Sequence, residues 1–206
     1  NESFIGFEAS NDLTTEAGPD LLNEDGTPAA RSLIISAPTT ELTAAERATV
    51  AEFADAGGAV ILLGSAADQD AVSNFEPVLT ELNANVSFTD EAVTDETNSL
   101  TDDPAVFTTG NVSDAYADLF TSFTTENTTS TQPSGVGPVM LDSVSSLLNA
   151  NGEPLTNDSV VAVSAESTAT NSDTDGNGDA VSYPSGTDIP VVAVDGSVVG
   201  VTGPFV

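Results

Sequence analysis

The stretch that decides the fold is residues 32–63, SLIISAPTTELTAAERATVAEFADAGGAVILL. Its first five and last five residues are short apolar runs, which is typical of strands buried in a sheet. Between them, Thr43 and Glu46 have the spacing of a capping box, in which a hydroxyl and a carboxylate satisfy the free amides of a first helical turn. Gly57 and Gly58 then provide a helix end. The stretch therefore predicts strand, helix and strand in succession.

The same pattern continues to residue 88. Ser73 and Glu76 form a second predicted capping box, and residues 86–88 form a third apolar run. Strands and helices that alternate with short links predict a parallel βαβαβ unit over residues 32–88. The core face of its second helix is expected to consist of Phe75, Val78, Leu79 and Leu82.

The second half, residues 89–206, is richer in loops. Residues 139–141 and 160–163 are predicted strands, and residues 191–201 predict a β-hairpin with Asp195-Gly196 in a type I′ turn. We expect one α/β domain over residues 1–206, built as a flavodoxin-like, amidotransferase-like open sheet that is mostly parallel and ends in this hairpin.

The charge is extreme, since 33 carboxylates stand against Arg31 and Arg47, and the net charge is −31. Such self-repulsion destabilises a compact chain, but molar salt shortens the Debye length to about 3 Å. With 39% apolar residues the chain can still build a core. The composition predicts a folded protein of an extreme halophile. It counts against nucleic acid and anionic membranes as partners.

Cysteine is absent, which excludes disulfides and cysteine nucleophiles from this chain. No apolar run reaches the roughly 20 residues that a bilayer crossing needs, so no membrane insertion of this segment is expected. The start at Asn1 and the apolar ending favour a segment cut from a longer chain, or one that has lost a leader.

Residues 30–90 and 186–206 resemble a known family. The matching stretches are LTAAERATVAEFADAGG, AVILLGS, NFEPVLTELNA and IPVVAVDGSVVGVTG. They are similar to the non-catalytic branch of the class I glutamine amidotransferase-like fold, which occurs in secreted and surface proteins of halophilic archaea and in gliding and ciliary-transport proteins. Catalytic members use Cys, His and Glu, and this chain has neither Cys nor His. The resemblance therefore implies a scaffold without enzymatic activity.

A ligand crevice is expected where the two parallel strands end. Ser36, Thr39, Ser65 and Asp68 follow the carboxyl ends of these strands, where open α/β sheets bind ligands. A serine nucleophile there would have neither His nor Lys as its base. We therefore expect binding rather than catalysis at this edge, although a pair of carboxylates could still perform acid–base chemistry.

The best chemical motif is a candidate calcium loop. Asp173, Asp175, Asn177 and Asp179 alternate as oxygen donors, with a glycine at the sixth position. Pro184 stands where an EF-hand needs a bidentate Glu, so a looser loop completed by Asp188 or a backbone carbonyl is the hypothesis. A solvated acidic loop without metal is the alternative.

Asn-x-Ser/Thr sequons mark candidate glycosylation sites. Besides Asn1 they occur at Asn85, Asn111, Asn127 and Asn157, against the three or so that chance gives for this composition. The excess is small.

The leading functional hypothesis is a non-enzymatic, extracellular or cell-surface module of an extreme halophile that acts in assembly, through a protein partner or by self-assembly. The alternatives are a calcium-assisted adhesion or carbohydrate-binding module and a carboxylate-based hydrolase. Assembly predicts apolar surface on exposed faces or edges.

We expect folding to depend on salt, because the −31 charge is screened only at high ionic strength. Circular dichroism between molar and millimolar salt should show loss of structure at the low end. An unchanged spectrum and an unchanged melting temperature at both ends would contradict the halophile hypothesis.

Overall fold

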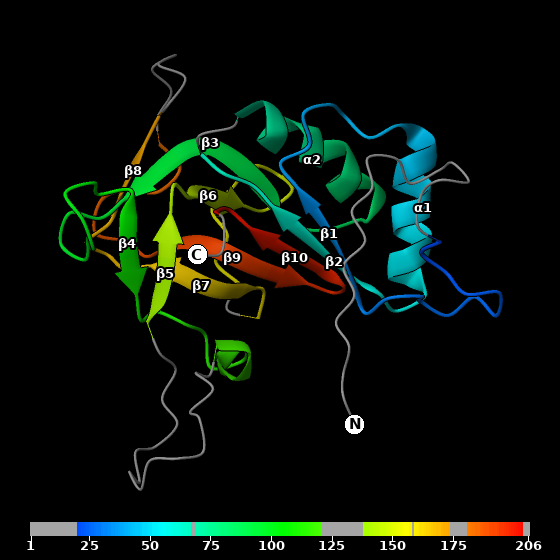
Figure 1. Ribbon diagram of the computed structural model, residues 1–206. Helices are drawn as coiled ribbons and strands as arrows, with labels where there is room; N and C mark the ends of the chain where they lie inside the picture. The colour runs from blue at the N-terminus through cyan, green and yellow to red at the C-terminus, as the bar shows by residue number, and fades with distance from the viewer. Residues whose placement is uncertain (1–19, 67–68, 121–137, 158, 174–180, 204–206) are drawn as a thin grey trace, which may run out of the picture.

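The computed structural model describes residues 20–66, 69–120, 138–157, 159–173 and 181–203. Its main sheet has five strands, and helices α1 and α2 cover one face of it (Figure 1). The strand order is β1 (Ser32–Ser36), β2 (Ala59–Leu63), β10 (Val198–Val201), β9 (Ile189–Asp195) and β7 (Val161–Ala165).

Helix α1 (Ala44–Asp55) begins as its sequence predicts. The hydroxyl of Thr43 accepts a hydrogen bond from the Glu46 amide at 3.3 Å, and the Thr43 amide donates to the Glu46 carboxylate at 2.8 Å. The predicted capping box is thus confirmed. At the other end the chain passes tightly under the helix, since a Cβ on Gly58 would lie 2.3 Å from the ring of Phe53. Only glycine fits there without moving this buried ring.

Helix α2 (Gln69–Glu81) starts four residues before the predicted capping box, so that prediction is wrong. Glu76 lies within the helix and accepts a hydrogen bond from the Ser87 hydroxyl at 2.6 Å instead. The predicted core face is confirmed for Phe75, Val78 and Leu79, which are buried. In the described part of the chain, no helix is long and apolar enough to cross a membrane.

Strands β1 and β2 are parallel, as predicted, but the third strand of the expected parallel unit is not beside them. The free edge of β2 pairs in parallel with β10 instead. Strand β3 (Ser87–Thr94) therefore lies in a second sheet, where it is antiparallel to β6 (Ser145–Leu148) and β8 (Thr170–Ser172). Apolar pattern alone does not distinguish these two placements, since both bury the strand.

The predicted fold class, a mostly parallel flavodoxin-like open sheet, is wrong. Two strand pairings among the described residues are parallel and five are antiparallel. A third small sheet consists of β4 (Val106–Thr109) and β5 (Val139–Asp142), and one 3-10 helix, η1, spans Ala117–Phe120. The molecule is mostly β, with mixed and antiparallel sheets.

The predicted C-terminal hairpin is confirmed, but its turn differs. Asp195 pairs with Val198, so the two turn residues are Gly196 and Ser197. Gly196 has φ +60°, whereas Ser197 has no positive φ. This pattern belongs to a type II′ turn, because type I′ needs positive φ at both central residues.

Two hydrophobic clusters form the core. The first lies between the helices and the main sheet, where the rings of Phe75 and Phe88 are 5.1 Å apart. The second joins β7 and β9 to the smaller sheets around Phe107 and Val144. The main sheet therefore packs on both faces over β9, while its β1 end has partners on one face only.

We expect Leu62→Ala to lower stability strongly. Leu62 is fully buried in the first cluster, and truncation of a buried leucine costs about 2–5 kcal/mol. Ile34→Ala is the matched control, because Ile34 on the neighbouring strand is 47% exposed. Denaturation in molar salt measures both variants. Equal losses of stability would contradict the assignment of the core to the helix-covered face.

Candidate functional site

The predicted crevice at the ends of β1 and β2 is partly filled. Ser36 and Ser65 do lie at the same end of neighbouring strands, but the Ser65 hydroxyl donates to the Ser143 carbonyl at 3.2 Å. Ser36 and Thr39 are exposed, and Asp68 lies outside the described residues. The two clefts that follow are lined by other side chains. Ligand binding at this edge stays a prediction.

The candidate calcium loop falls mostly outside the described residues. Asp173 follows strand β8, whereas Asp175, Asn177 and Asp179 are among residues 174–180. Within the described ranges, no group of three or more carboxylate, His or Cys side chains could hold a metal ion. Calcium binding stays a prediction.

Three of the candidate glycosylation sites are described. Asn85 and Asn157 are exposed, and the Asn157 side chain accepts hydrogen bonds from Ser159. Asn111 is only half-exposed, since its backbone pairs with strand β7. Asn127 lies outside the described residues.

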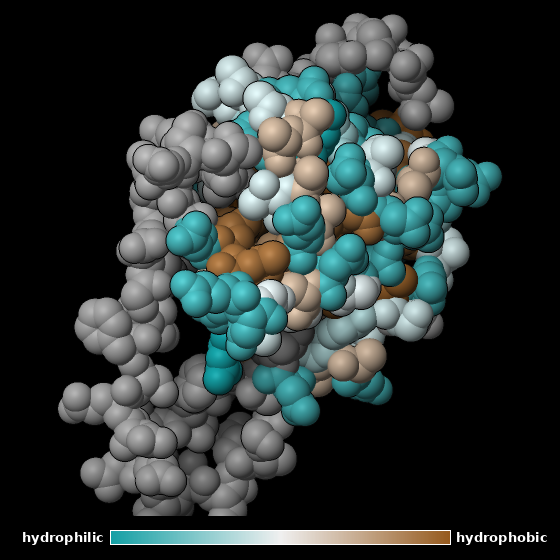
Figure 2. Space-filling model, turned by 90° about the vertical axis from the view of Figure 1, so that its right-hand side faces the viewer, coloured by the Kyte–Doolittle hydropathy of each residue, from teal (hydrophilic) through white to brown (hydrophobic). Residues whose placement is uncertain are grey.

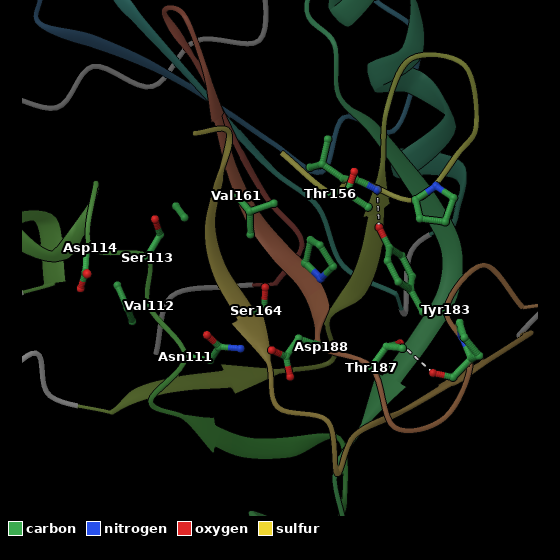
Figure 3. A pocket seen from close by; sticks show the side chains of 15 residues that line it. Asn111, Val112, Ser113, Asp114, Thr156, Val161, Ser164, Tyr183, Thr187 and Asp188 are labelled. Atoms are coloured by element: carbon green, nitrogen blue, oxygen red, sulfur yellow. Dashed lines mark hydrogen bonds between the residues drawn. The ribbon is translucent and has the colours of Figure 1, made fainter. Parts of the chain in front are cut away.

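The larger cleft, with a volume of about 690 Å³, lies along the outer edge of β7 (Figure 3). One wall is the segment around Val112, which makes an isolated antiparallel bridge to Val163. Two backbone hydrogen bonds hold it there: Ser113 donates to Ala162, and Ser164 donates to Asn111, each at 3.0 Å. Residues 154–156 and 183–190 complete the cleft.

Three polar side chains converge in this cleft from separate segments. Figure 3 shows Asn111 and Asp188 pointing toward each other, with Ser164 beside them. Ser164 is only 8% exposed and Asp188 is exposed, so the three lead from the floor of the cleft to its rim. No other described residue forms a hydrogen bond to the side chain of Asn111, Ser164 or Asp188. Their hydrogen-bonding capacity is available to a ligand.

Tyr183 forms an apolar wall of the cleft. Its hydroxyl donates to the Leu147 carbonyl at 2.6 Å and accepts from the Leu155 amide at 2.8 Å. Burial raises the pKa of Tyr183; the charge of Glu91 adds to this rise, while the hydrogen bond from Leu155 opposes it. The neutral side chain therefore links Leu147 to Leu155, and at 5% exposure the residue offers little surface to a ligand.

A second cleft, of about 470 Å³, leads to the buried carboxylate of Glu91. Glu91 is 8% exposed and accepts hydrogen bonds from the Ser182 amide at 2.8 Å, the Ser182 hydroxyl at 2.9 Å and the Ser146 hydroxyl at 3.0 Å. The Asn171 amide group also donates to it. Every one of these donors is uncharged.

Glu91 holds both ends of the candidate calcium loop. Asn171 lies in β8 before the loop, and Ser182 lies after it. Glu91 was not predicted as a functional residue, because the third predicted strand ends at Phe88. The signal was present in the alternation of Thr89, Glu91 and Val93, which places all three on the inward face of β3.

Asp95 is a second buried carboxylate held by neutral donors. It accepts hydrogen bonds from the Thr97 amide, from the Asn98 backbone and side chain, and from the Thr168 hydroxyl, at 2.8–3.1 Å. Burial raises its pKa, but the hydrogen bonds from Asn98, Thr168 and Thr97 together outweigh burial, and the pKa lies below its ordinary value. Asp95 therefore ties the end of β3 to the turn before β8.

No protein-family model matches this chain, and no curated protein is significantly similar to it. Among solved structures, an mmIFT52 N-terminal domain matches with a TM-score of 0.55 and 13% identity, over 84% of this chain and 65% of that chain. At this identity the match shows a similar fold and nothing about activity.

This match and the strand pairings correct the family resemblance. The described chain is a mostly antiparallel structure similar to the mmIFT52 domain, and it is not a flavodoxin-like amidotransferase fold. The stretches that suggested the resemblance form strands and capped helices, and many folds share such elements.

We expect acid to remove a stabilising contribution of Asp95. Its pKa in the folded chain is below the ordinary 3.8, so the unfolded chain binds this proton at higher pH than the folded chain does. The contribution is present above the ordinary pKa and is lost as the pH falls through the lower folded value. The stability gap between wild type and Asp95→Asn should therefore narrow between about pH 6 and about pH 3.

Denaturant unfolding in molar salt at several pH values measures this gap. The exposed Asp102, which lacks these hydrogen bonds, supplies the control variant Asp102→Asn. A gap for Asp95→Asn that stayed constant or widened in acid would refute the role given to Asp95.

Proposed function

We propose that this chain is a non-catalytic protein-interaction module that acts in the assembly of a surface or secreted protein of an extreme halophile. The observation that carries the proposal is the open edge of the main sheet at β1, together with the apolar row that begins there. The acidic composition supports the salty setting.

The backbone of β1 can accept another strand. Arg31 and Ala37, at either end, hydrogen-bond to β2 through Ala59 and Leu63. In a parallel ladder alternate residues face the same neighbour, so the peptide groups of Ser32, Ile34 and Ser36 point away from β2. No described strand lies on that side of β1. Such an edge is a template for pairing with another chain.

An apolar row crosses the sheet from this edge. Ile34 pairs with Ile61, Ile61 with Val199, and Val199 with Val194, all on the face opposite α1. Ile34 is 47% exposed, whereas the other three are half-buried and pack against the second hydrophobic cluster, so the row is open to a partner at its β1 end. By contrast, Figure 2 shows the side of the molecule that carries α1, where hydrophilic side chains dominate and hydrophobic ones lie in recesses. The apolar row is therefore the better contact surface.

A different protein fits this edge better than a second copy. Molar salt screens charges beyond about 3 Å but not those in direct contact, so a second copy of −31 charge meets more short-range repulsion at an interface than a less acidic partner does. Catalysis is not proposed, because the chain has no His, Cys or Lys to act as nucleophile or base beside its serines.

The test compares Ile34→Glu with Leu100→Glu. Both replace an exposed apolar side chain with the same charge, at 47% and 51% exposure, but only Ile34 lies on the open edge. Binding partners from an extract of the source organism, captured in molar salt and identified by mass spectrometry, should be retained by wild type and Leu100→Glu and lost by Ile34→Glu. Sedimentation in the same salt should show a monomer.

Equal capture by both variants would refute the β1 edge as the contact surface. A wild-type dimer that Ile34→Glu dissociates would replace the heterologous partner with a second copy of this chain.

A further inference from the structure

We propose that the cleft beside β7 binds the guanidinium group of an arginine side chain presented by a protein partner, with Asp188, Asn111 and Ser164 as its hydrogen-bonding groups. The inference rests on the proposed function in that the ligand belongs to a protein. It concerns a different surface, because β7 and β1 are the opposite edges of the main sheet.

The charge of the cleft selects a cation. Asp188 and Asp114 both line it, and both are exposed at its rim. Neither arginine of the chain lines the cleft, and Arg47 already pairs with Glu41 at 2.8 Å. An anionic ligand would be repelled by these carboxylates, and no cationic side chain of the lining would offset the repulsion. A cationic ligand would be attracted by the same carboxylates.

The floor of the cleft supplies a buried acceptor. Ser164 is 8% exposed, and its backbone is fixed by hydrogen bonds from Thr109 to its carbonyl and from its amide to Asn111. No described residue takes up its hydroxyl. Its oxygen is therefore reachable from the cleft and can accept a hydrogen bond from a ligand donor.

The shape of the site argues for an organic cation. A hard metal ion takes six to eight oxygen ligands and gathers several carboxylates. Here the described lining of a cleft of about 690 Å³ contains two carboxylates, Asp188 and Asp114, and apolar side chains such as Val112 and Val161 lie beside them. These walls suit the aliphatic stem of a long cationic side chain.

Guanidinium fits better than the other organic ligands of similar size. Its planar fork donates to a carboxylate through two parallel bonds, and further N–H groups remain for the Ser164 hydroxyl and for the Asn111 side-chain oxygen, which faces Asp188 once the amide is turned by 180°. A sugar usually stacks on an open aromatic face, and Tyr183 is only 5% exposed.

The test uses two capped tripeptides, acetyl-Gly-Arg-Gly-amide and the same peptide with neutral citrulline. Binding to the full ¹⁵N-labelled chain in molar salt is followed by NMR at the amide group of Asn111 and the backbone of Ser164. The arginine peptide should shift these signals in a saturable way. Asp188→Asn should weaken its binding roughly fivefold, as expected for one charge-assisted pair at a rim.

The matched control is Glu52→Gln, which removes the same charge from the exposed side of α1 and should bind like wild type. Citrulline should weaken binding to wild type as much as Asp188→Asn does, and should have no further effect in Asp188→Asn. Asp188 is exposed and has no described hydrogen bond, so an unchanged amide spectrum checks that this variant folds.

No saturable shift, equal binding of the two peptides, or equal weakening by Asp188→Asn and Glu52→Gln would each overturn the site. These outcomes leave the β1 edge untouched, because Ile34 lies at the far side of the sheet. Conversely, loss of the β1 contact leaves peptide binding in the cleft measurable.

Discussion

The pairing of β10 with β2 is the constraint on which the rest of the structure depends. Strand β10 lies parallel to β2 and antiparallel to β9, so the C-terminal hairpin fills the position that a third parallel strand would take. Strand β3 is thereby excluded from the main sheet and pairs with β6 and β8 in the second one. The same insertion leaves β1 and β7 as the two edges.

The two edges of the main sheet differ in whether another segment covers them, and this difference decides where the two candidate surfaces lie. Segment 111–113 bonds to β7 and shields that edge, leaving a cleft beside it rather than an open backbone. Strand β1 has no described neighbour on its outer side. At about 4.8 Å per strand spacing, the four gaps between β1 and β7 put these surfaces roughly 19 Å apart. A partner large enough to touch both would have to span the apolar face of the sheet.

Because the chain has only two cationic side chains, its buried carboxylates are stabilised by neutral hydrogen-bond donors. Glu91 and Asp95 are buried, yet neither is paired with an arginine; backbone amides, hydroxyls and side-chain amides of Ser, Thr and Asn stabilise them. For Asp95, hydrogen bonds of this kind outweigh burial and lower the pKa of the carboxylate. These polar clusters hold residues 168, 171 and 182 to β3 and to the residue that follows it. The serine- and threonine-rich composition thus has a structural use beyond solvation.

Local features were determined by the sequence itself. The strands at 32–36 and 59–63, the cap formed by Thr43 and Glu46, the buried face of α2 and the C-terminal hairpin all follow from patterns within a few residues. Tertiary structure alone decided that β10 rather than β3 pairs with β2, that Glu91 gathers Ser146, Asn171 and Ser182, and that Asn111, Ser164 and Asp188 share a cleft. The physical reason is that helix caps and side-chain alternation are short-range effects, whereas the edge of a strand accepts any strand that buries its apolar face, and that choice depends on the whole chain.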